Sequence, residues 1–367
     1  MKDSQINMLE HSEVKVKLLG LYMERYLNIL YLSKYIETVI LFDLFCGEGI
    51  YENGGKGSPI IMLESINNLE VDNSNKSGFE IHFNDIDLPK VNKLQNEITN
   101  RDLVSKKITG LYYTNNDYQK MLPYVVSMFT GFSKRRGFIF IDPYGYKEIR
   151  LSHIKELLRP GTTEVLLFLP THFMFRFEEK GTPQSLKEFI SELIPESQWP
   201  KSETGIEFID RLKNAFKKKL GNDKLVDTFI ISRDKNQFFC LFFFTSHIYG
   251  FDRMLDAKWK LDEEQGRGFA FKSNGDLFSV VEKSANTFPL EKGLKEFLKT
   301  PKTNGEVYEF ALHLGYLPTH TNQILKSFQD TGNLEIKSNG DKIQKGAFYV
   351  NYKNYKNNFD KITINFK

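Results

Sequence analysis

Acidic residues and glycines follow several apolar segments of this sequence, at positions where side chains could bind a ligand. Asp43 ends the apolar run that begins at Val39, and Gly47 and Gly49 come directly after it. Glycine tolerates a positive φ and carries no Cβ, so this loop can bring its backbone close to a ligand. A carboxylate belongs at the end of a buried strand because an unpaired charge is costly inside one. The pattern predicts a buried strand that leads into a ligand-binding loop.

The next two apolar runs also end in carboxylates. Asp85 follows the run Phe79–Phe83, with Asp87 as a competing candidate, and Asp117 follows the run 110–113. We expect Asp85 to accept hydrogen bonds from ribose hydroxyls. Asp117 could accept a hydrogen bond from an adenine amine, or it could simply cap the helix that follows. The coincidence of three carboxylates with the glycine loop carries the prediction, more than any one of them.

A fourth run, Phe138–Ile141, ends in Asp142-Pro143-Tyr144. Methylation of an exocyclic amine requires the nitrogen lone pair to point at the methyl group. A carboxylate and a backbone carbonyl achieve this by accepting the two N–H bonds, while an aromatic ring holds the base. We therefore expect these three residues to face an acceptor, with Tyr146 as a substitute aromatic. The alternative is that the Asp-Pro pair only ends the strand.

The elements that must position these residues are strands separated by helical sequence. A fifth apolar run, Val165–Leu169, follows the first four, and two more, 225–231 and 238–244, are joined by a short polar turn that suits an antiparallel hairpin. In open α/β sheets, ligands bind at the carboxyl edge of the strands. The sequence predicts an α/β, Rossmann-like sheet. Parallel strands closed by a hairpin resemble the class I methyltransferase pattern, and this resemblance implies strand order 3-2-1-4-5-7-6 with the last strand antiparallel.

Flanking segments complete the predicted organisation. Apolar spacings of three and four over 15–35 predict an amphipathic helix. Ser58 is expected to be the N-cap of a crossover helix, with Pro59 as its first helical residue. We expect an N-terminal helical segment over 1–38, a methyltransferase-like domain over 39–285, and a winged-helix-like domain over 286–367. An insertion at about 171–224 either contacts substrate or forms an ordinary solvated helix.

The winged-helix prediction depends on three short helices and a hairpin. The helices are expected over 290–298, 306–314 and 321–328, and the hairpin over 334–350 with Asn339-Gly340 in its turn. The third helix carries Thr321, Asn322, Gln323 and Lys326 and would enter a major groove if this module binds DNA. The alternative is a protein-protein adapter.

Composition limits the classes of protein that fit. The 367 residues carry 50 Lys and Arg against 47 Asp and Glu, so any nucleic-acid surface must be local. Two cysteines cannot form a disulfide framework or a four-cysteine zinc site, which fits a reducing compartment. The sequence starts without an apolar signal region and contains no apolar run near the ~20 residues that span a bilayer. We expect a cytoplasmic protein without a membrane partner or a bound metal.

The motif Asp43-x-Phe45-x-Gly47-x-Gly49 resembles the first motif of class I methyltransferases that use S-adenosylmethionine (SAM). A dinucleotide fingerprint would need a third glycine at the spacing Gly-x-Gly-x-x-Gly, and it is missing. Amino-methyltransferases of adenine and cytosine use Asp/Asn-Pro-Pro-aromatic where this chain has Asp142-Pro143-Tyr144, so the second proline is absent. The missing proline weakens the prediction that the acceptor is an exocyclic amine.

The order of motifs along the chain resembles the three-Cys-motif partner (TcmP) family. The resemblance is carried by Lys15-x₆-Tyr22-x₃-Tyr26, the segments 42–51, 57–59 and 141–145, and Gly250-x₃-Met254-Leu255-x-Ala257-x-Trp259. It implies a SAM-methyltransferase-like protein that acts with a three-Cys-motif partner protein. With it, the residues expected to bind the cofactor are Lys15, Tyr22, Asp43, Phe45, Gly47, Gly49, Ser58, Asp85 and Asp117.

Three hypotheses follow for the function. The first is a SAM-dependent methyltransferase that acts on nucleic acid, in which Asp142, Pro143 and Tyr144 orient the acceptor. The second is a non-catalytic nucleic-acid-binding or protein-binding module on the same scaffold, which the imperfect motif at Asp142 motivates. The third is a metal-dependent nuclease, since strand-end carboxylates can also bind Mg²⁺.

Overall fold

The computed structural model of the chain describes residues 7–70, 77–144, 149–176, 184–195, 204–234, 237–270, 284–340, 343–344 and 346–367. Two compact units are present: Met1–His247 with Gly268–Gly275, and Ile248–Arg267 with Asp276–Lys367. The division differs from the boundary expected between 285 and 286, because helix α10 (Ile248–Leu261) belongs to the second unit. Tyr146 and the last glycine of the motif after Asp142 lie outside the described residues, as does part of the 171–224 segment.

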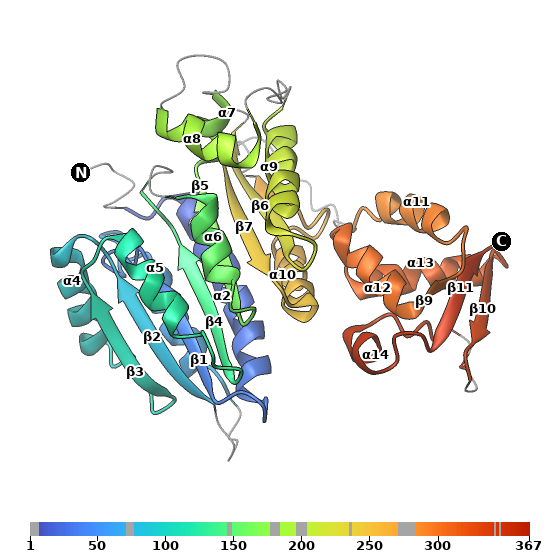
Figure 1. The fold of residues 1–367 in the computed structure, drawn as a ribbon, viewed down its shortest axis with the longest axis horizontal. Helices are drawn as coiled ribbons and strands as arrows, with labels where there is room; N and C mark the ends of the chain where they lie inside the picture. The colour runs from blue at the N-terminus through green and yellow to red at the C-terminus, as the bar shows by residue number, and fades with distance from the viewer. Residues whose placement is uncertain are drawn as a thin grey trace. The chain divides into compact units, whose positions relative to one another are not determined.

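The first unit is built on an eight-stranded sheet (Figure 1), and its order is β3-β2-β1-β4-β5-β7-β6-β8. Strand β1 pairs in parallel with β2 and β4, whereas β7 runs antiparallel to both β5 and β6. This confirms the predicted class I methyltransferase order with its reversed strand. The short β8, parallel to β6 at the sheet edge, was not predicted. The strands are β1 (Thr38–Asp43), β2 (Gly78–Asn84), β3 (Ile108–Thr114), β4 (Arg135–Ile141), β5 (Thr163–Leu169), β6 (Leu225–Asp234), β7 (Gln237–Thr245) and β8 (Gly268–Ala270).

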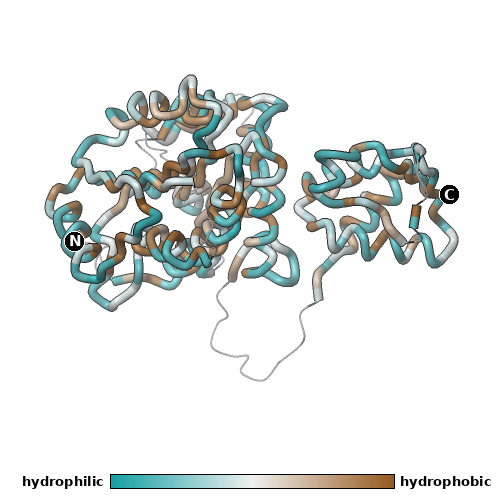
Figure 2. Tube along the Cα trace, turned by 90° about the horizontal axis from the view of Figure 1, so that it is seen from below, coloured by the Kyte–Doolittle hydropathy of each residue, from teal (hydrophilic) through white to brown (hydrophobic). Residues whose placement is uncertain are grey.

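Both faces of the central strands are buried, as expected of apolar runs in a parallel sheet. Alternate residues point to opposite faces: Ile139 joins one core cluster with the helices α5, α6, α8 and α9, while Phe138 packs against Tyr22 and Tyr26 of α2. Figure 2 shows apolar segments running through the interior of this unit. Its helices are α2 (Glu10–Tyr31), α3 (Ser58–Asn67), α4 (Leu88–Asn100), α5 (Tyr118–Ser127), α6 (Leu151–Leu158), α7 (Thr171–Arg176), α8 (Gln184–Leu193) and α9 (Gly205–Leu220).

Helices α3 and α9 begin in different ways. Helix α3 has Gly57 as its N-cap, so the expected capping role of Ser58 is wrong by one position, and Ser58 is the first helical residue. Helix α9 begins with a capping box between Thr204 and Glu207 and ends in three exposed lysines, which favourably face the negative end of the helix dipole. Its other face is buried in the core. This part of the 171–224 segment therefore matches the solvated-helix alternative.

The second unit consists of helices and a three-stranded sheet of order β10-β11-β9. The predicted hairpin strand at 348–350 is wrong: the partner of β10 is β11. Tyr349 has φ of 56°, which an extended strand does not allow, and Phe348 and Val350 on either side of it are buried. The elements are α11 (Phe288–Phe297), β9 (Lys302–Thr303), α12 (Asn304–His313), α13 (Pro318–Asp330), β10 (Leu334–Ser338), α14 (Tyr352–Asn357) and β11 (Ile362–Phe366).

Specific contacts hold α10 in the second unit. The Tyr308 hydroxyl donates to Asp252 Oδ2 at 2.6 Å, and Trp259 Nε1 donates to the Gly315 carbonyl at 2.9 Å. The rings of Tyr249 and Tyr352 stack with centroids 3.9 Å apart. These contacts come from both ends of α10, which explains why the helix belongs to the second unit. No helix in the described part of the chain is long and apolar enough to cross a membrane.

Candidate functional site

A cavity of about 910 Å³ opens beside the carboxyl ends of β1, β4 and β5. Its lining comes from the start of α2, the glycine loop after β1, the ends of β4 and β5, and the β6–β7 hairpin. Ligand pockets in proteins span roughly 300–1,000 Å³, so this one is large enough for two small ligands side by side or one extended ligand. It lies where an open α/β sheet is expected to bind its ligand.

The glycine loop forms one wall of the cavity. Gly47 and Gly49 have φ of 61° and 79°, values that side chains rarely adopt. At Gly49 a Cβ would also lie 2.4 Å from Leu94 Cδ1, so a larger residue there would have to displace the Leu94 side chain in addition to straining the backbone. The Gly57 N–H donates to the Gly49 carbonyl at 2.7 Å and closes the loop onto the start of α3. Both glycines line the cavity at the positions that the sequence predicted.

Asp43 lies behind this wall. It is fully buried and its Oδ1 accepts a hydrogen bond from the Phe45 N–H at 3.2 Å. Burial raises the pKa of Asp43 to about 7, and the Ser58 side chain and the Phe45 amide oppose that rise. Within the described residues Oδ2 accepts no hydrogen bond of ordinary geometry. Asp43 is not among the lining residues, so its observed role is to shape the start of the loop.

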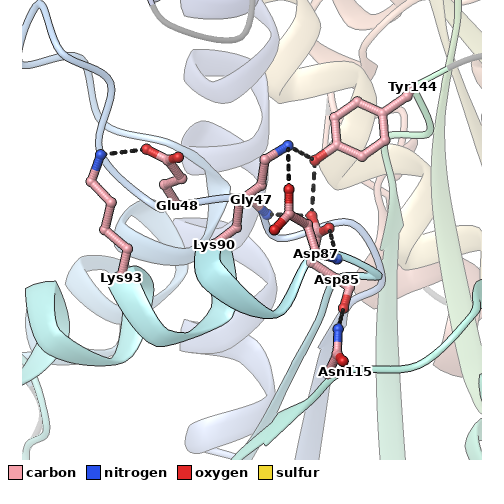
Figure 3. Close-up of polar contacts among 8 residues, drawn as sticks. All are labelled: Gly47, Glu48, Asp85, Asp87, Lys90, Lys93, Asn115 and Tyr144. Carbon is pink, nitrogen blue, oxygen red and sulfur yellow. Dashed lines mark hydrogen bonds and ion pairs between the residues drawn. The ribbon is translucent and has the colours of Figure 1, made fainter. Parts of the chain in front are cut away.

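Asp85 fastens the glycine loop from the neighbouring strand end (Figure 3). It is fully buried, and its Oδ2 accepts hydrogen bonds from the Gly47 N–H at 3.0 Å and from the Tyr144 hydroxyl at 2.9 Å. Its Oδ1 accepts from the Asp87 N–H at 3.0 Å, and the Asn115 side chain donates to its carbonyl at 2.9 Å. Asp85 therefore binds loop backbone on one side and a tyrosine on the other.

Tyr144 lies between Asp85 and the cavity. Its hydroxyl accepts a hydrogen bond from Lys90 Nζ at 2.8 Å, and the same ammonium group is 4.5 Å from its ring centroid. Burial and the Asp85 carboxylate raise the pKa of the Tyr144 hydroxyl, which stays protonated as a donor. Tyr144 lines the cavity and Asp85 does not. In this structure the tyrosine covers the carboxylate that the sequence assigns to a ribose.

Asp142 lines the same cavity from the end of β4 and forms an ion pair with Lys15 of α2. The Lys15 side chain is 6% exposed and that of Asp142 is 22% exposed. Burial acts to lower the pKa of Lys15, but Asp142 outweighs it and the net shift is upward. Lys15 Nζ also lies 4.6 Å from the ring centroid of Phe168. The ammonium group thus fixes the carboxylate at the cavity wall.

The structure separates the other predicted residues into two groups. Phe45, Ser58 and Pro143 line the cavity together with Lys15, the glycines, Asp142 and Tyr144. Asp117 instead accepts from the Gln119 N–H at 2.8 Å as the N-cap of α5, the alternative that the sequence left open. Tyr22 is fully buried and donates to Glu164 Oε2 in the core. Neither Asp117 nor Tyr22 is a lining residue.

Several lining residues were missed by the sequence analysis: His11, Phe168, His172, Arg233 and Phe239. Phe238 in the predicted strand 238–244 is in the core, but strand alternation turns Phe239 to the other face. Phe168 and His172 belong to the end of β5 and the segment after it. The signal that could have found them is their place at a strand end, the same signal that identified the carboxylates.

Comparison with solved structures finds methyltransferase-like folds among the neighbours. A Legionella pneumophila protein of family DUF519 is 13% identical with a TM-score of 0.41, over 68% of this chain and 90% of that one. The methyltransferase domain of a bacterial Hen1 protein is 13% identical with a TM-score of 0.30, over 62% and 99%. A putative rRNA methylase from Clostridium thermocellum is 8% identical with a TM-score of 0.29, over 60% and 93%.

No family model matches the chain, and the comparison with curated proteins finds no match. The resemblance to three-Cys-motif partner proteins therefore remains a prediction. At these low identities and TM-scores the solved neighbours carry no argument about activity, and the observed strand order defines the architecture. The first unit has a Rossmann-like, methyltransferase-like fold.

Proposed function

We propose that the protein is a SAM-dependent methyltransferase that acts on a base amine of nucleic acid. The observation that carries the proposal is that the glycine loop and Asp142 face one cavity at the carboxyl edge of the sheet. When bound, SAM supplies a methyl group on a positively charged sulfur. The resemblance to the TcmP family adds the proposal that a three-Cys-motif partner protein takes part.

The residues of the cavity fit such a cofactor. The loop at Gly47 and Gly49 presents backbone without Cβ atoms to the methionine half. Asp85, held by the Gly47 amide, is proposed to accept hydrogen bonds from ribose hydroxyls once the Tyr144 hydroxyl no longer occupies its Oδ2. Burial of Asp85 supports this role, because hydrogen bonds to a carboxylate are stronger where water is excluded.

Asp142 is proposed to orient the acceptor. Its carboxylate would accept one N–H bond of the acceptor amine and turn the nitrogen lone pair toward the methyl group. The nitrogen loses a proton as the new N–C bond forms, and Asp142 is placed to take it. Lys15 would keep the carboxylate fixed through the ion pair. Pro143 and the ring of Tyr144 are proposed to contact the base, as the sequence predicts.

Two measurements test the proposal. Isothermal calorimetry with SAM and the full chain, at ligand concentrations well above micromolar, should show binding, and the absence of heat together with an unchanged melting temperature would remove the cofactor. Asp142→Asn should bind SAM as the wild type does but transfer no labelled methyl group to mixed single-stranded DNA or RNA. Asp87→Asn, which changes a carboxylate outside the cavity lining, is the matched control.

A non-catalytic binding module on this scaffold is the second candidate. The contact between Tyr144 and Asp85 favours it, because a permanently covered carboxylate could not bind a ribose. The two candidates differ in one result: a module without catalysis would bind nucleic acid, unchanged in Gly47→Arg, while the wild type neither binds SAM nor transfers a methyl group. Among the described residues, no group of three or more His, Cys, Asp or Glu is arranged to hold a metal ion, so no observation favours the nuclease alternative.

A further inference from the structure

Aromatic rings form a layer in the wall of the cavity. The rings of His11 and Phe239 stack with centroids 4.3 Å apart and an interplanar angle of 11°. Phe168 stacks on Phe239 at 5.5 Å and 17°, and His172 meets the same ring edge-on at 4.8 Å. The four residues come from three separate segments of the chain, and all of them line the cavity. We call these four residues the aromatic layer.

The aromatic layer is connected to the proposed acceptor-orienting carboxylate. Lys15 Nζ lies 4.6 Å from the ring centroid of Phe168 and pairs with Asp142. A flat ring bound against the layer would therefore have its edge near the Asp142 side chain. Phe168 and His172 are almost fully buried, whereas His11 and Phe239 keep part of their surface exposed. An incoming ligand could therefore contact the rings of His11 and Phe239.

The charges around the layer favour a neutral ring over a cationic side chain. The carboxylates that line the cavity are Glu48 and Asp142, and each is paired with a lysine, Lys93 or Lys15. A lysine or arginine acceptor would have to break one of these pairs. His11 is itself neutral near pH 7, because burial and then Lys15 lower its pKa to about 4. Its ring nitrogens make no hydrogen bond within the described residues and can serve the edge of a base.

A cation lies beside the aromatic layer. Arg233 is exposed on β6 and lines the cavity. Its positive charge contributes to lowering the pKa of His11. Proteins that bind single-stranded nucleic acid combine aromatic rings for the bases with arginines or lysines for the backbone. Because the net charge of the chain is only +3, a local cation of this kind is what a polyanion would have to use.

We infer that the aromatic layer is the acceptor subsite, that it takes an unstacked nucleobase of a single-stranded or flipped-out nucleotide, and that Arg233 contacts the adjoining phosphate. The inference rests on the proposed function for its reaction, but binding of the base does not require methyl transfer. A base in this subsite would be held by stacking and would present its exocyclic amine to Asp142.

The experiment compares two substitutions at one position. Binding of end-labelled single-stranded DNA and RNA to the full chain is measured by fluorescence anisotropy with S-adenosylhomocysteine present. Phe239→Leu should lose roughly 5- to 140-fold in affinity, the range that follows from base–aromatic stacking. Phe239→Tyr keeps a ring and should stay within about twofold of the wild type. Tyr35→Leu, at an aromatic residue that is 67% exposed and outside the cavity lining, should leave affinity unchanged.

A second variant guards against failure of the first to fold. His11→Ala changes the layer from α2 and should weaken binding in the same direction, with an unchanged melting temperature as the check on folding. Arg233→Gln should reduce the slope of log affinity against log salt by about 0.7, the value for one phosphate contact on a single strand. A slope equal to that of the wild type would remove Arg233 from the interface.

The outcomes separate this inference from the proposed function. Calorimetric binding of SAM by Phe239→Leu, together with unchanged oligonucleotide affinity, would overturn the subsite and leave the methyltransferase proposal in place. A wild-type chain that binds oligonucleotide through the layer but not SAM would support the subsite and overturn the enzyme. If the wild type binds neither DNA nor RNA and instead methylates a peptide, the nucleobase is the wrong class of ligand.

Discussion

Replacing Tyr144 by Phe should make the protein bind SAM more tightly. In the unliganded structure the Tyr144 hydroxyl donates to Asp85 Oδ2 at 2.9 Å, and a ribose hydroxyl of the cofactor is proposed to need that same oxygen. The substitution removes the competing donor and keeps the ring. It therefore destabilises the unliganded state and leaves the liganded state, in which the hydroxyl has been displaced, nearly unchanged.

The size of the effect follows from the contact. A hydrogen bond to a charged group contributes about 1.5–3 kcal/mol. Asp85 Oδ2 keeps the Gly47 N–H after the change, so the lower value applies. At about 1.4 kcal/mol per factor of ten, the dissociation constant for SAM should fall about tenfold. The unfolding free energy of the unliganded protein should fall by at least this amount, because the hydrogen bond from Lys90 to the same hydroxyl is lost as well.

Isothermal calorimetry and urea unfolding of the same preparations give the two numbers. Tyr112→Phe is the matched control, since Tyr112 is an exposed tyrosine of β3 that does not line the cavity. An unchanged or weaker affinity for SAM in Tyr144→Phe would refute the reasoning. It would mean that the hydroxyl takes part in binding the cofactor, or that Asp85 does not receive the ribose.

Buried or constrained positions in the first unit give three further predictions. Lys15→Met should lower the unfolding free energy in urea by about 3 kcal/mol, because Asp142 would lose its cation. Lys15 keeps its charge below pH 10.5, and the contribution of the pair is lost as the pH rises through the raised pKa of Lys15. Glu164 has its pKa raised from 4.5 to about 7 by burial, so the folded state binds more protons between these values and stability falls as the pH rises across them. Glu164→Gln should remove up to roughly 3 kcal/mol of that fall, and an unchanged pH profile of denaturation would contradict it. Gly49→Ala, with its steric clash, should lower the melting temperature more than Gly47→Ala, which costs about 1–2 kcal/mol for the left-handed backbone alone; the reverse order would contradict the loop geometry.

The sheet could be predicted from the sequence because its strands are continuous apolar runs that end in polar residues. Because both faces of these strands are buried, the pairing register of β1 with β2 and β4 is tightly constrained. The carboxyl ends of the parallel strands, including Leu41–Asp43, then meet at one edge of the sheet. The same reasoning placed Asp142 and the glycine loop correctly beside the cavity. What a strand end cannot indicate is the direction of its side chain. In the structure Asp43 and Asp85 accept hydrogen bonds from the loop backbone, and Tyr144 lies between Asp85 and the cavity.

The rest of the site depends on pairs that are distant in the chain. Lys15 and Asp142 are separated by 127 residues, and Tyr144 and Asp85 by 59. No local pattern specifies such partners, because they follow from tertiary packing. The error at 348–350 had a different cause. An apolar triplet after an Asn-Gly turn is typical of a hairpin strand, but Tyr349 takes a positive φ there.

The place of α10 in the second unit has a practical consequence for dissecting this protein. The backbone changes unit at 247/248, at 267/268 and again at 275/276. A fragment that starts at residue 286 would lack the helix whose Asp252 and Trp259 bind Tyr308 and Gly315, and would leave those partners exposed to water. A fragment that stops at 247 would lack β8 and uncover residues 230–232 of β6, which lengthens the open sheet edge that can pair with another chain. Truncations at either point should aggregate, so the two units are best compared by point substitutions in the intact polypeptide.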